Sequence, residues 1–244
     1  MIEAWGITDK GAVRPENQDS YYLKLHGERL AAAMVCDGMG GHRAGNVASA
    51  LAVEVASAYL ESLTDEELAQ APSEHLNRAL NLSNEAVFRK SNQEMDYAGM
   101  GTTMVSAIVV DTTVHILNIG DSRAYHISAG GIQKITRDHS VVEDMVRRGE
   151  ITPDEARLHP RKNLITRALG GQAKALADLY EVHWASGDYI LLCSDGLSNS
   201  LTDQEILYEI LHGGARETCC QRLLDQSLAR GATDNVTAVL IYIG

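Results

Sequence analysis

Residues 35–45 read VCDGMGGHRAG, which places an aspartate and four glycines directly after the strand-like apolar run AAAMVC. A tight turn from a strand into a helix would explain this stretch, because Asp-Gly pairs favour turns and glycine adopts positive φ without steric cost. A phosphate-binding loop or a metal site would explain it equally well. The surrounding sequence discriminates among these three interpretations.

The two common phosphate-loop patterns do not match this stretch. In the dinucleotide-binding pattern G-x-G-x-x-G, the third glycine would be Arg43. The spacing of a P-loop is present, yet Asn46 and Val47 stand where that loop needs a lysine and a hydroxyl residue. A turn and a metal site are the two interpretations that survive.

Hydrophobic periodicity predicts strands and helices on both sides of this stretch. Helices are expected over 44–63, over 73–94, from Thr202 onward and over 215–230. Four β-rich runs between 102 and 136 are joined by short Asp-Thr, Gly-Asp and Gly-Gly turns, which predicts an antiparallel meander. Because strands and helices do not alternate regularly, we expect an α+β architecture with antiparallel sheets.

Further aspartates stand beside short apolar runs or turns, namely Asp19, Asp121, Asp195 and Asp234. Each of them alone is most simply a turn residue. Strand ends from distant parts of a chain can nevertheless meet at one edge of an antiparallel sheet. Carboxylates gathered there would supply the oxygen ligands that Mg²⁺ and Mn²⁺ prefer. By pattern alone, a metal site and a set of turn residues both stay open.

The bulk composition excludes several classes of protein. The 244 residues are 45% hydrophobic, which predicts a sizeable core and a single domain over 1–244. A formal net charge of −12 argues against binding to nucleic acid or to anionic membranes. The four cysteines have no C-x-x-C spacing and are expected to be reduced and buried. With no secretory leader and no long apolar run in the sequence, we expect a cytoplasmic location.

The order of motifs along the chain resembles that of the metal-dependent protein phosphatases (PPM), the type-2C serine/threonine phosphatases, and looks most like their compact bacterial members. The motifs cover nearly the whole chain and read TDKGAVRPENQDS, VCDGMGGHRAG, GTT, NIGDSRAY, TRDHS, ITRALG, CSDGLS and ATDNVT. The resemblance implies a four-layer αββα sandwich, in which helix pairs flank two antiparallel β-sheets and metal ions lie at one edge.

The resemblance also implies roles for individual residues. Asp37 matches the aspartate that bridges two metal ions, and the carbonyl group of Gly38 would bind one of these ions. Asp195 and Asp234 match carboxylates on the second ion. Arg14 matches the arginine that grips the substrate phosphate, with which it can form two hydrogen bonds at once.

Other motif positions are matched less completely. Asp19 matches an acidic position that holds metal-bound water in the second shell, and Asp121 matches the aspartate associated with a weaker third metal. Met39 replaces a histidine that many eukaryotic members carry as a proposed general acid, so the group that protonates the leaving oxygen is unassigned. Thr103 and His139 are motif positions to which no role is assigned.

The implied activity is hydrolysis of phosphoserine and phosphothreonine in proteins. Two Mn²⁺ or Mg²⁺ ions, with a weaker third one, would share a water or hydroxide and aim it in line at phosphorus, without a phosphoenzyme. The expected partners are phosphorylated proteins, including a Hanks-type kinase that the enzyme would oppose, and the chain is expected to be a monomer. A non-catalytic phosphoprotein-binding module and a hydrolase of small phosphoesters stay open as alternatives.

Residues 141–172 correspond in place to the flap of the bacterial enzymes. Within them, Thr152 opens a capping box with Glu155. The segment concentrates basic residues in an acidic protein, namely Arg147, Arg148, Arg157, Arg161, Lys162 and Arg167. They would form either a solvated helical face or a mobile wall that meets the substrate protein.

Overall fold

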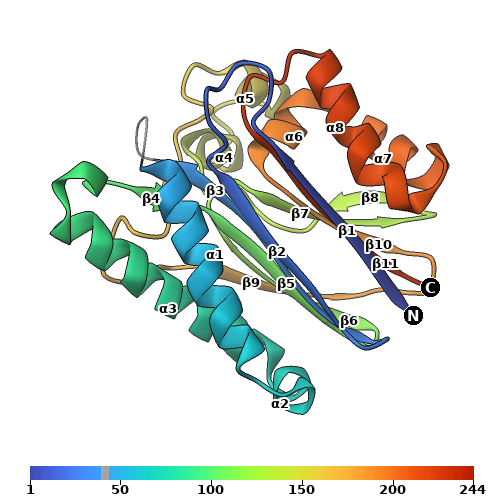
Figure 1. Cartoon of the computed structure of the whole chain (residues 1–244). Helices are drawn as coiled ribbons and strands as arrows, with labels where there is room; N and C mark the ends of the chain where they lie inside the picture. The colour runs from blue at the N-terminus through green and yellow to red at the C-terminus, as the bar shows by residue number, and fades with distance from the viewer. Residues whose placement is uncertain (40–43) are drawn as a thin grey trace.

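The computed structural model covers residues 1–244 and describes residues 1–39 and 44–244. Its strands form two antiparallel sheets that pack face to face (Figure 1). The first sheet has, in order, β1 (Ile2–Asp9), β11 (Val236–Ile243), β10 (Tyr189–Cys193), β7 (Arg123–Ser128) and β8 (Gly131–Lys134). The second sheet has β2 (Asp19–His26), β3 (Leu30–Met39), β5 (Met104–Val110), β6 (Thr113–Ile119) and β9 (Asp178–His183), and β4 (Gly101–Thr102) pairs with β3.

Helices cover the outer face of each sheet, so the molecule has four layers (Figure 1). The second sheet is covered by α1 (Gly45–Glu61) and α3 (Pro72–Gln93), with α2 (Asp65–Gln70) between them. The first sheet is covered by α6 (Asp195–Ser200), α7 (Asp203–His212) and α8 (Cys219–Ala229). Two short helices, α4 (Val141–Arg147) and α5 (Pro153–Leu158), lie at one end of the sandwich. The expected αββα sandwich is therefore confirmed.

Strand β3 is fixed on both of its faces, because it lies between two apolar layers. Ala31, Ala33 and Val35 belong to the core between the two sheets. Ala32 and Met34 belong to the core beneath the helices, and all five of these side chains are buried. Alternation of side chains along a strand produces this division. The last residues of β3 are consequently held in place by packing on both sides.

The expected meander between residues 102 and 136 is wrong. Strands β5 and β6 form a hairpin in the second sheet, whereas β7 and β8 form a hairpin in the first. The chain crosses between the sheets at 120–122, and Gly120 turns it there with a φ of 107°. A Cβ atom on Gly120 would lie 2.5 Å from the Thr103 side chain. Turn residues do not encode which sheet the next strand joins, so the pattern could not predict this crossing.

Most of the other local predictions are confirmed. Capping boxes begin the helices after Thr152 and Thr202, and all four cysteines are free and buried. The helix expected over 215–230 begins at Cys219, because residues 216–218 form a short 3₁₀ turn. The short helices α2 and α6 were not expected. Within residues 1–39 and 44–244, no helix is both long and apolar enough to span a bilayer.

Candidate metal centre

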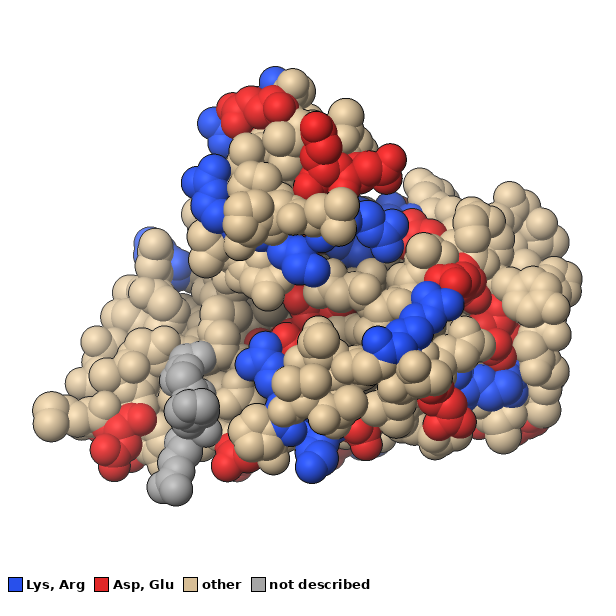
Figure 2. Space-filling model, turned by 90° about the horizontal axis from the view of Figure 1, so that it is seen from above, with Lys and Arg blue, Asp and Glu red and all other residues tan. Residues whose placement is uncertain are grey.

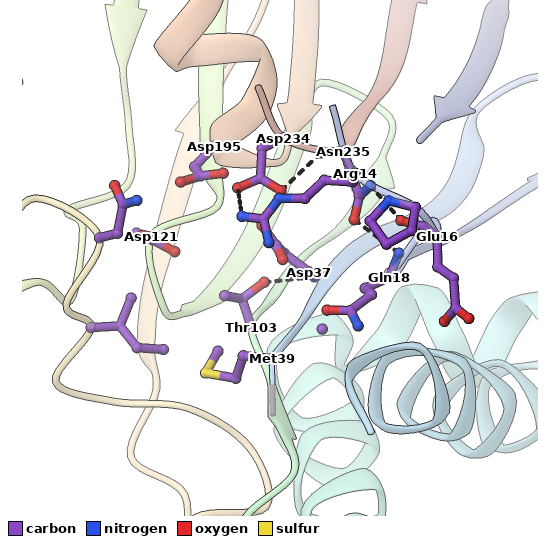
Figure 3. Close-up of a pocket in the computed structure, with 14 residues that line it drawn as sticks. Arg14, Glu16, Gln18, Asp37, Met39, Thr103, Asp121, Asp195, Asp234 and Asn235 are labelled. Atoms are coloured by element: carbon purple, nitrogen blue, oxygen red, sulfur yellow. Dashed lines mark hydrogen bonds and ion pairs between the residues drawn. The ribbon is translucent and has the colours of Figure 1, made fainter. Parts of the chain in front are cut away.

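One end of the sandwich carries a cavity of about 390 Å³ that is lined by acidic side chains (Figure 3). Four aspartates of this lining come from four separate parts of the chain. Asp37 lies near the end of β3, and Asp121 lies where the chain crosses between the sheets. Asp195 is the first residue of α6, and Asp234 stands two residues before β11. The fold thus gathers carboxylates that the sequence separates by up to 197 positions, from Asp37 to Asp234.

A fifth aspartate lies directly behind this cavity. Asp19 is paired with Asp37 in the register of β2 and β3, so the two acids face each other across neighbouring strands. One carboxylate oxygen of Asp19 accepts hydrogen bonds from Ser194 Oγ and Thr237 Oγ1, both at 2.7 Å. Its other oxygen is buried and has no hydrogen-bond partner within the described residues. Asp19 therefore links the two sheets through one carboxylate oxygen, while the other oxygen remains available as a hydrogen-bond acceptor.

Mutual repulsion and burial make this group of acids costly to ionise. Burial, and then the charges of Asp19, Asp195, Asp121 and Asp234, raise the pKa of Asp37 well above its ordinary value. Burial also raises the pKa of Asp121 to about 8 and that of Asp195 to about 6, with neighbouring carboxylates adding to each shift. The pKa of Asp19 is raised to about 7, chiefly by burial. Such a group is stabilised by cations that hold the charged forms.

The residues at this site fit hard divalent cations. All the side-chain donors are oxygens, and Oδ1 of Asp195, like that of Asp19, is buried without a hydrogen-bond partner among the described residues. Among residues 1–39 and 44–244, no three His, Cys, Asp or Glu side chains form a complete metal cage. Ions here would therefore need carbonyl and water ligands beside the carboxylates, which is how Mg²⁺ is usually held.

Gly38 is the residue whose carbonyl is expected to contribute such a ligand. Its N–H donates to the Gln18 carbonyl oxygen at 3.0 Å, which holds this part of β3 close to the loop before β2. A Cβ atom on Gly38 would lie only 2.0 Å from the carbonyl oxygen of Gly45. A side chain is therefore excluded at position 38 unless the backbone moves. Gly40 and Gly41, two other glycines of this stretch, lie outside the described residues.

Arg14 lies at the mouth of the cavity, beside Asp234. Its Nη2 atom is 2.6 Å from Oδ2 of Asp234, and its Nε donates to the Thr233 carbonyl oxygen at 3.4 Å. About half of the Arg14 side chain is exposed (48%), so the guanidinium group is within reach of a ligand that enters from solvent. The structure thus places an arginine and the carboxylates in one cavity (Figure 3).

Thr103, which had no assigned role, holds the backbone of Asp37. Its hydroxyl accepts a hydrogen bond from the Asp37 N–H at 2.9 Å and shares another with Ser122 Oγ at 2.7 Å. Thr102 Oγ1 donates to the Asp37 carbonyl oxygen at 2.8 Å. The two threonines and Ser122 are buried, so these bonds are sheltered from water. They connect the end of β3 to the crossing that carries Asp121.

His139, the other unassigned motif residue, also holds this crossing. Its Nδ1 accepts a hydrogen bond from the Gly120 N–H at 3.1 Å, and its backbone N–H donates to the Gly120 carbonyl oxygen at 2.8 Å. Its Nε2 faces Asp178 Oδ2 at 3.1 Å. Burial lowers the pKa of His139. These bonds fix the backbone directly before Asp121.

Asn235 is a site residue that sequence reasoning missed. Its amide nitrogen donates to the carbonyl oxygens of Lys10 and Glu16, both at 2.9 Å, and its Oδ1 accepts from the Gln18 N–H at 2.9 Å. These bonds hold the loop that carries Arg14 against the strand end that carries Asp234. Its position immediately after Asp234 in the motif ATDNVT was the available signal.

The residues expected to form the site are all found at one place. Arg14, Asp37, Gly38, Asp121, Asp195 and Asp234 line the cavity. Asp19 lies behind it and bonds to Ser194 and Thr237. Met39, Asn163 and Ile165 complete the wall on the side of residues 141–172. The assignment of these residues as metal ligands and phosphate contacts stays a prediction.

The two-sheet sandwich with carboxylates at its end is the architecture of a metal-dependent protein phosphatase. The family model described as protein phosphatase 2C matches residues 14–231 of the chain. The chain therefore belongs to the protein phosphatase 2C family, and it is an enzyme of the serine/threonine phosphatase class.

Individual relatives agree with this family assignment. The serine/threonine phosphatase Stp of Listeria monocytogenes is 37% identical over 237 residues, which cover 96% of this chain and 93% of that protein. The crystal structure of the phosphatase Stp1 from Staphylococcus aureus has a TM-score of 0.92 and 36% identity, and the match covers 100% of this chain and 96% of that one. The catalytic domain of the phosphatase PstP, solved with two manganese ions, has a TM-score of 0.86 and 34% identity, with 100% and 99% covered.

Proposed function

We propose that this phosphatase hydrolyses phosphoserine and phosphothreonine in proteins by direct attack of water, with two Mn²⁺ or Mg²⁺ ions in the acidic cavity. Asp37 would bridge the two ions, the Gly38 carbonyl would bind one, and Asp195 and Asp234 would bind the other. The observation that carries this proposal is the group of buried carboxylates with raised pKa values beside Arg14. The two manganese ions of the related PstP structure support the choice of metal and the number of ions.

The metal ions, when bound, supply positive charge for the phosphoryl oxygens and activate the attacking water. Arg14 would bind the substrate phosphate through two nitrogen atoms, which orients the phosphoryl group toward the carboxylate side of the cavity. The hydrogen bonds that the Asp37 backbone donates to Thr103 and accepts from Thr102 would hold Asp37 in place during the reaction. Preorganised charge and position account for most of catalysis in phosphoryl transfer.

No side chain is proposed as a covalent nucleophile. Cys36 and Cys193 lie close in sequence to Asp37 and Asp195, but both are fully buried. Burial raises the pKa of the Cys193 thiol to about 12, and it also raises the pKa of Cys36. Thiols that stay protonated are poor nucleophiles. We therefore propose that no phosphoenzyme forms.

The remaining assignments are finer proposals on the same site. Asp121 would bind a third, weaker ion, and Asp19 would hold water in the second shell. The residue that protonates the leaving oxygen is not assigned, because Met39 carries no proton to donate. Residues 1–244 would form one catalytic domain, with 141–172 as a flap subdomain. We also propose that the enzyme acts as a cytoplasmic monomer on phosphorylated proteins, including a Hanks-type kinase that it opposes.

The test is phosphate release from a phosphothreonine peptide by metal-stripped protein that is titrated with Mn²⁺ or Mg²⁺. We expect turnover that rises with metal in the wild type and is lost in Asp37→Asn. The matched control is Asp225→Asn, which changes an exposed aspartate on α8 and should retain full activity. A folded wild type without turnover at any metal concentration would overturn the proposal. Turnover of small phosphoesters alone would favour a small-molecule hydrolase instead.

A further inference from the structure

A second cavity, of about 360 Å³, adjoins the catalytic one and shares Asp121 and Asp195 with it as common walls. Its other lining residues come from α4 and α5, from β7 and β8, and from α6 and the start of α7. It therefore lies between the flap-like segment and the body of the enzyme. Figure 2 looks down on this end of the molecule, where Lys and Arg side chains border a hollow that contains Asp and Glu side chains.

Two of the cations in the second cavity are already neutralised. Arg123 pairs with Asp138 at 2.7 Å, and Lys134 lies 3.3 Å from Asp138 and 3.7 Å from Glu143. Asp138 is buried, so its pair with Arg123 is a fixed part of the wall. These four residues balance one another and leave no net charge for a ligand.

The two cations contributed by the flap-like segment are different. Arg157 and Lys162 line the cavity and are exposed to solvent. Neither forms an ion pair within residues 1–39 and 44–244. The other carboxylates of this cavity are Asp203 and the two shared with the catalytic cavity, Asp121 and Asp195, and the charge of Lys162 acts to lower the pKa of Asp195. Where Asp121 and Asp195 hold the proposed metal ions, the cavity has two further positive groups, Arg157 and Lys162, against one further negative group, Asp203, in a protein whose formal net charge is −12.

Neighbouring cations of the same segment provide a contrast. Arg147 lies 3.7 Å from Asp144, and Arg148 lies 3.4 Å from Glu150. Neither of them lines the second cavity. Of the other two cations of the segment, Arg167 pairs with Asp178 at 3.0 Å, and Arg161, which lies 3.6 Å from Met145 Sδ, has no ion pair among the described residues and does not line the cavity. Arg157 and Lys162 are therefore the two cations of the segment that line the cavity without an ion pair.

We propose that the second cavity binds an anionic side chain of the substrate protein, a carboxylate or a second phosphoryl group, close in sequence to the phosphorylated residue. This inference rests on the proposed function, because it requires the target phosphate in the adjoining cavity. An extended peptide advances by about 3.3–3.6 Å per residue, so residues a few positions from the target can reach a cavity with a shared wall. The guanidinium of Arg157 can take two oxygens of such a group, and Lys162 adds a second charge.

The test uses synthetic phosphothreonine peptides that differ at one neighbouring position, where Gln, Glu or phosphoserine is placed in turn at each site from three residues before to three after. For each protein, kcat/KM for the anionic peptide is divided by kcat/KM for the Gln peptide. We expect a ratio of about 3 to 10 in the wild type at the best position, and a ratio near 1 in Arg157→Gln/Lys162→Gln. The Glu and phosphoserine arms distinguish a carboxylate from a phosphoryl ligand.

The matched control is Arg147→Gln/Arg148→Gln, which removes the same charge from the same segment outside the cavity. It should keep the wild-type ratio. A wild-type ratio near 1 at every position, or an equal loss in the control, would overturn the proposal.

Binding of the same peptides to Asp37→Asn protein, measured by fluorescence anisotropy, gives the corresponding ratio of Kd values without turnover. If no peptide is hydrolysed by the wild type, the proposed function fails. The Kd ratios then still decide whether the second cavity selects an anion.

Discussion

The core between the two sheets and the acidic cavity at their end meet in strand β3, yet they contribute to the free energy of folding with opposite sign. In β3, Ala31, Ala33 and Val35 are buried between the sheets, and two residues later Asp37 faces four other carboxylates. Apolar burial stabilises the fold. Clustered buried carboxylates destabilise it until cations neutralise them. The packed sandwich therefore tolerates a site that is unfavourable on its own.

The largest effect that separates the two regions should be on activity. Asp195→Asn removes a proposed metal ligand and should lower kcat/KM by roughly 10³-fold, because metal ions supply several kcal/mol of transition-state stabilisation. Steady-state kinetics on a phosphothreonine peptide at saturating Mn²⁺ would measure the change. Activity within threefold of the wild type would show that Asp195 is not needed for the reaction.

A substitution in the core should lower the stability of the protein and leave its activity nearly unchanged. Ile116 is fully buried between the sheets, so Ile116→Ala should lower the free energy of unfolding by about 2–5 kcal/mol. Its kcat per folded molecule should stay close to that of the wild type, because no cavity residue is changed. Urea unfolding, together with kinetics corrected for the folded fraction, measures both quantities. A large loss of kcat in the folded fraction would mean that the two regions are not separable.

The pH dependence of stability should show the cost of the carboxylates directly. The pKa values of Asp195, Asp19 and Asp121 in the folded protein are about 6, 7 and 8, all above the ordinary value of 3.8. Between pH 3.8 and pH 8 the folded state therefore binds more protons than the unfolded state, so the free energy of unfolding falls as pH rises. We expect metal-free protein to lose about 2 kcal/mol or more between pH 5 and pH 8.

Urea unfolding of metal-stripped protein at several pH values would measure this loss. Asp121→Asn removes one of the titrating groups and should flatten the dependence, and Mn²⁺ should flatten it further. A metal-free wild type whose stability does not change over this range would contradict the electrostatic account.

The smallest effect should come from the hydroxyl bridge that joins Thr103 to Ser122. Ser122→Ala leaves Thr103 with one partner fewer and should lower the free energy of unfolding by about 1 kcal/mol. It should also weaken Mn²⁺ binding several-fold, because the bridge positions Asp37 relative to the Asp121 crossing.

The matched control for this change is Ser83→Ala. Ser83 is also fully buried, but its hydroxyl donates to the Ala52 carbonyl oxygen between α1 and α3. We expect Ser83→Ala to lower the free energy of unfolding by a similar amount and to leave the Mn²⁺ affinity, measured by calorimetry, unchanged. Equal loss of Mn²⁺ affinity in both variants would show that the bridge has no special role.

The sequence predicted more of the individual elements than of their connections. Alternating and helical apolar patterns located most strands and helices, because side-chain periodicity follows directly from backbone geometry. The crossing at Gly120 was missed, since the choice of sheet depends on packing between distant strands. The expected meander failed for that reason.

The sequence predicted the charged residues that line the cavity, but it did not predict the polar residues that hold their backbone in place. Asp37, Asp195 and Asp234 each adjoin an apolar run, so their position at strand ends could be expected. The Thr103–Ser122 bridge and the three backbone hydrogen bonds of Asn235 join segments far apart in the chain. Uncharged polar residues have no distinctive pattern, so only the folded arrangement identifies such contacts.

The most direct test of the central claim is the thermal unfolding of wild type and Asp37→Asn, each with and without Mn²⁺. Without metal, Asp37→Asn should melt higher than the wild type, by about 2–4 °C for each kcal/mol of repulsion that is removed. With Mn²⁺ the order should reverse, because the wild type gains binding free energy that the variant largely lacks. Two results together would contradict the claim that these carboxylates destabilise the fold until cations bind. The first is a wild type that melts above Asp37→Asn without metal, and the second is a wild-type melting temperature that Mn²⁺ does not change.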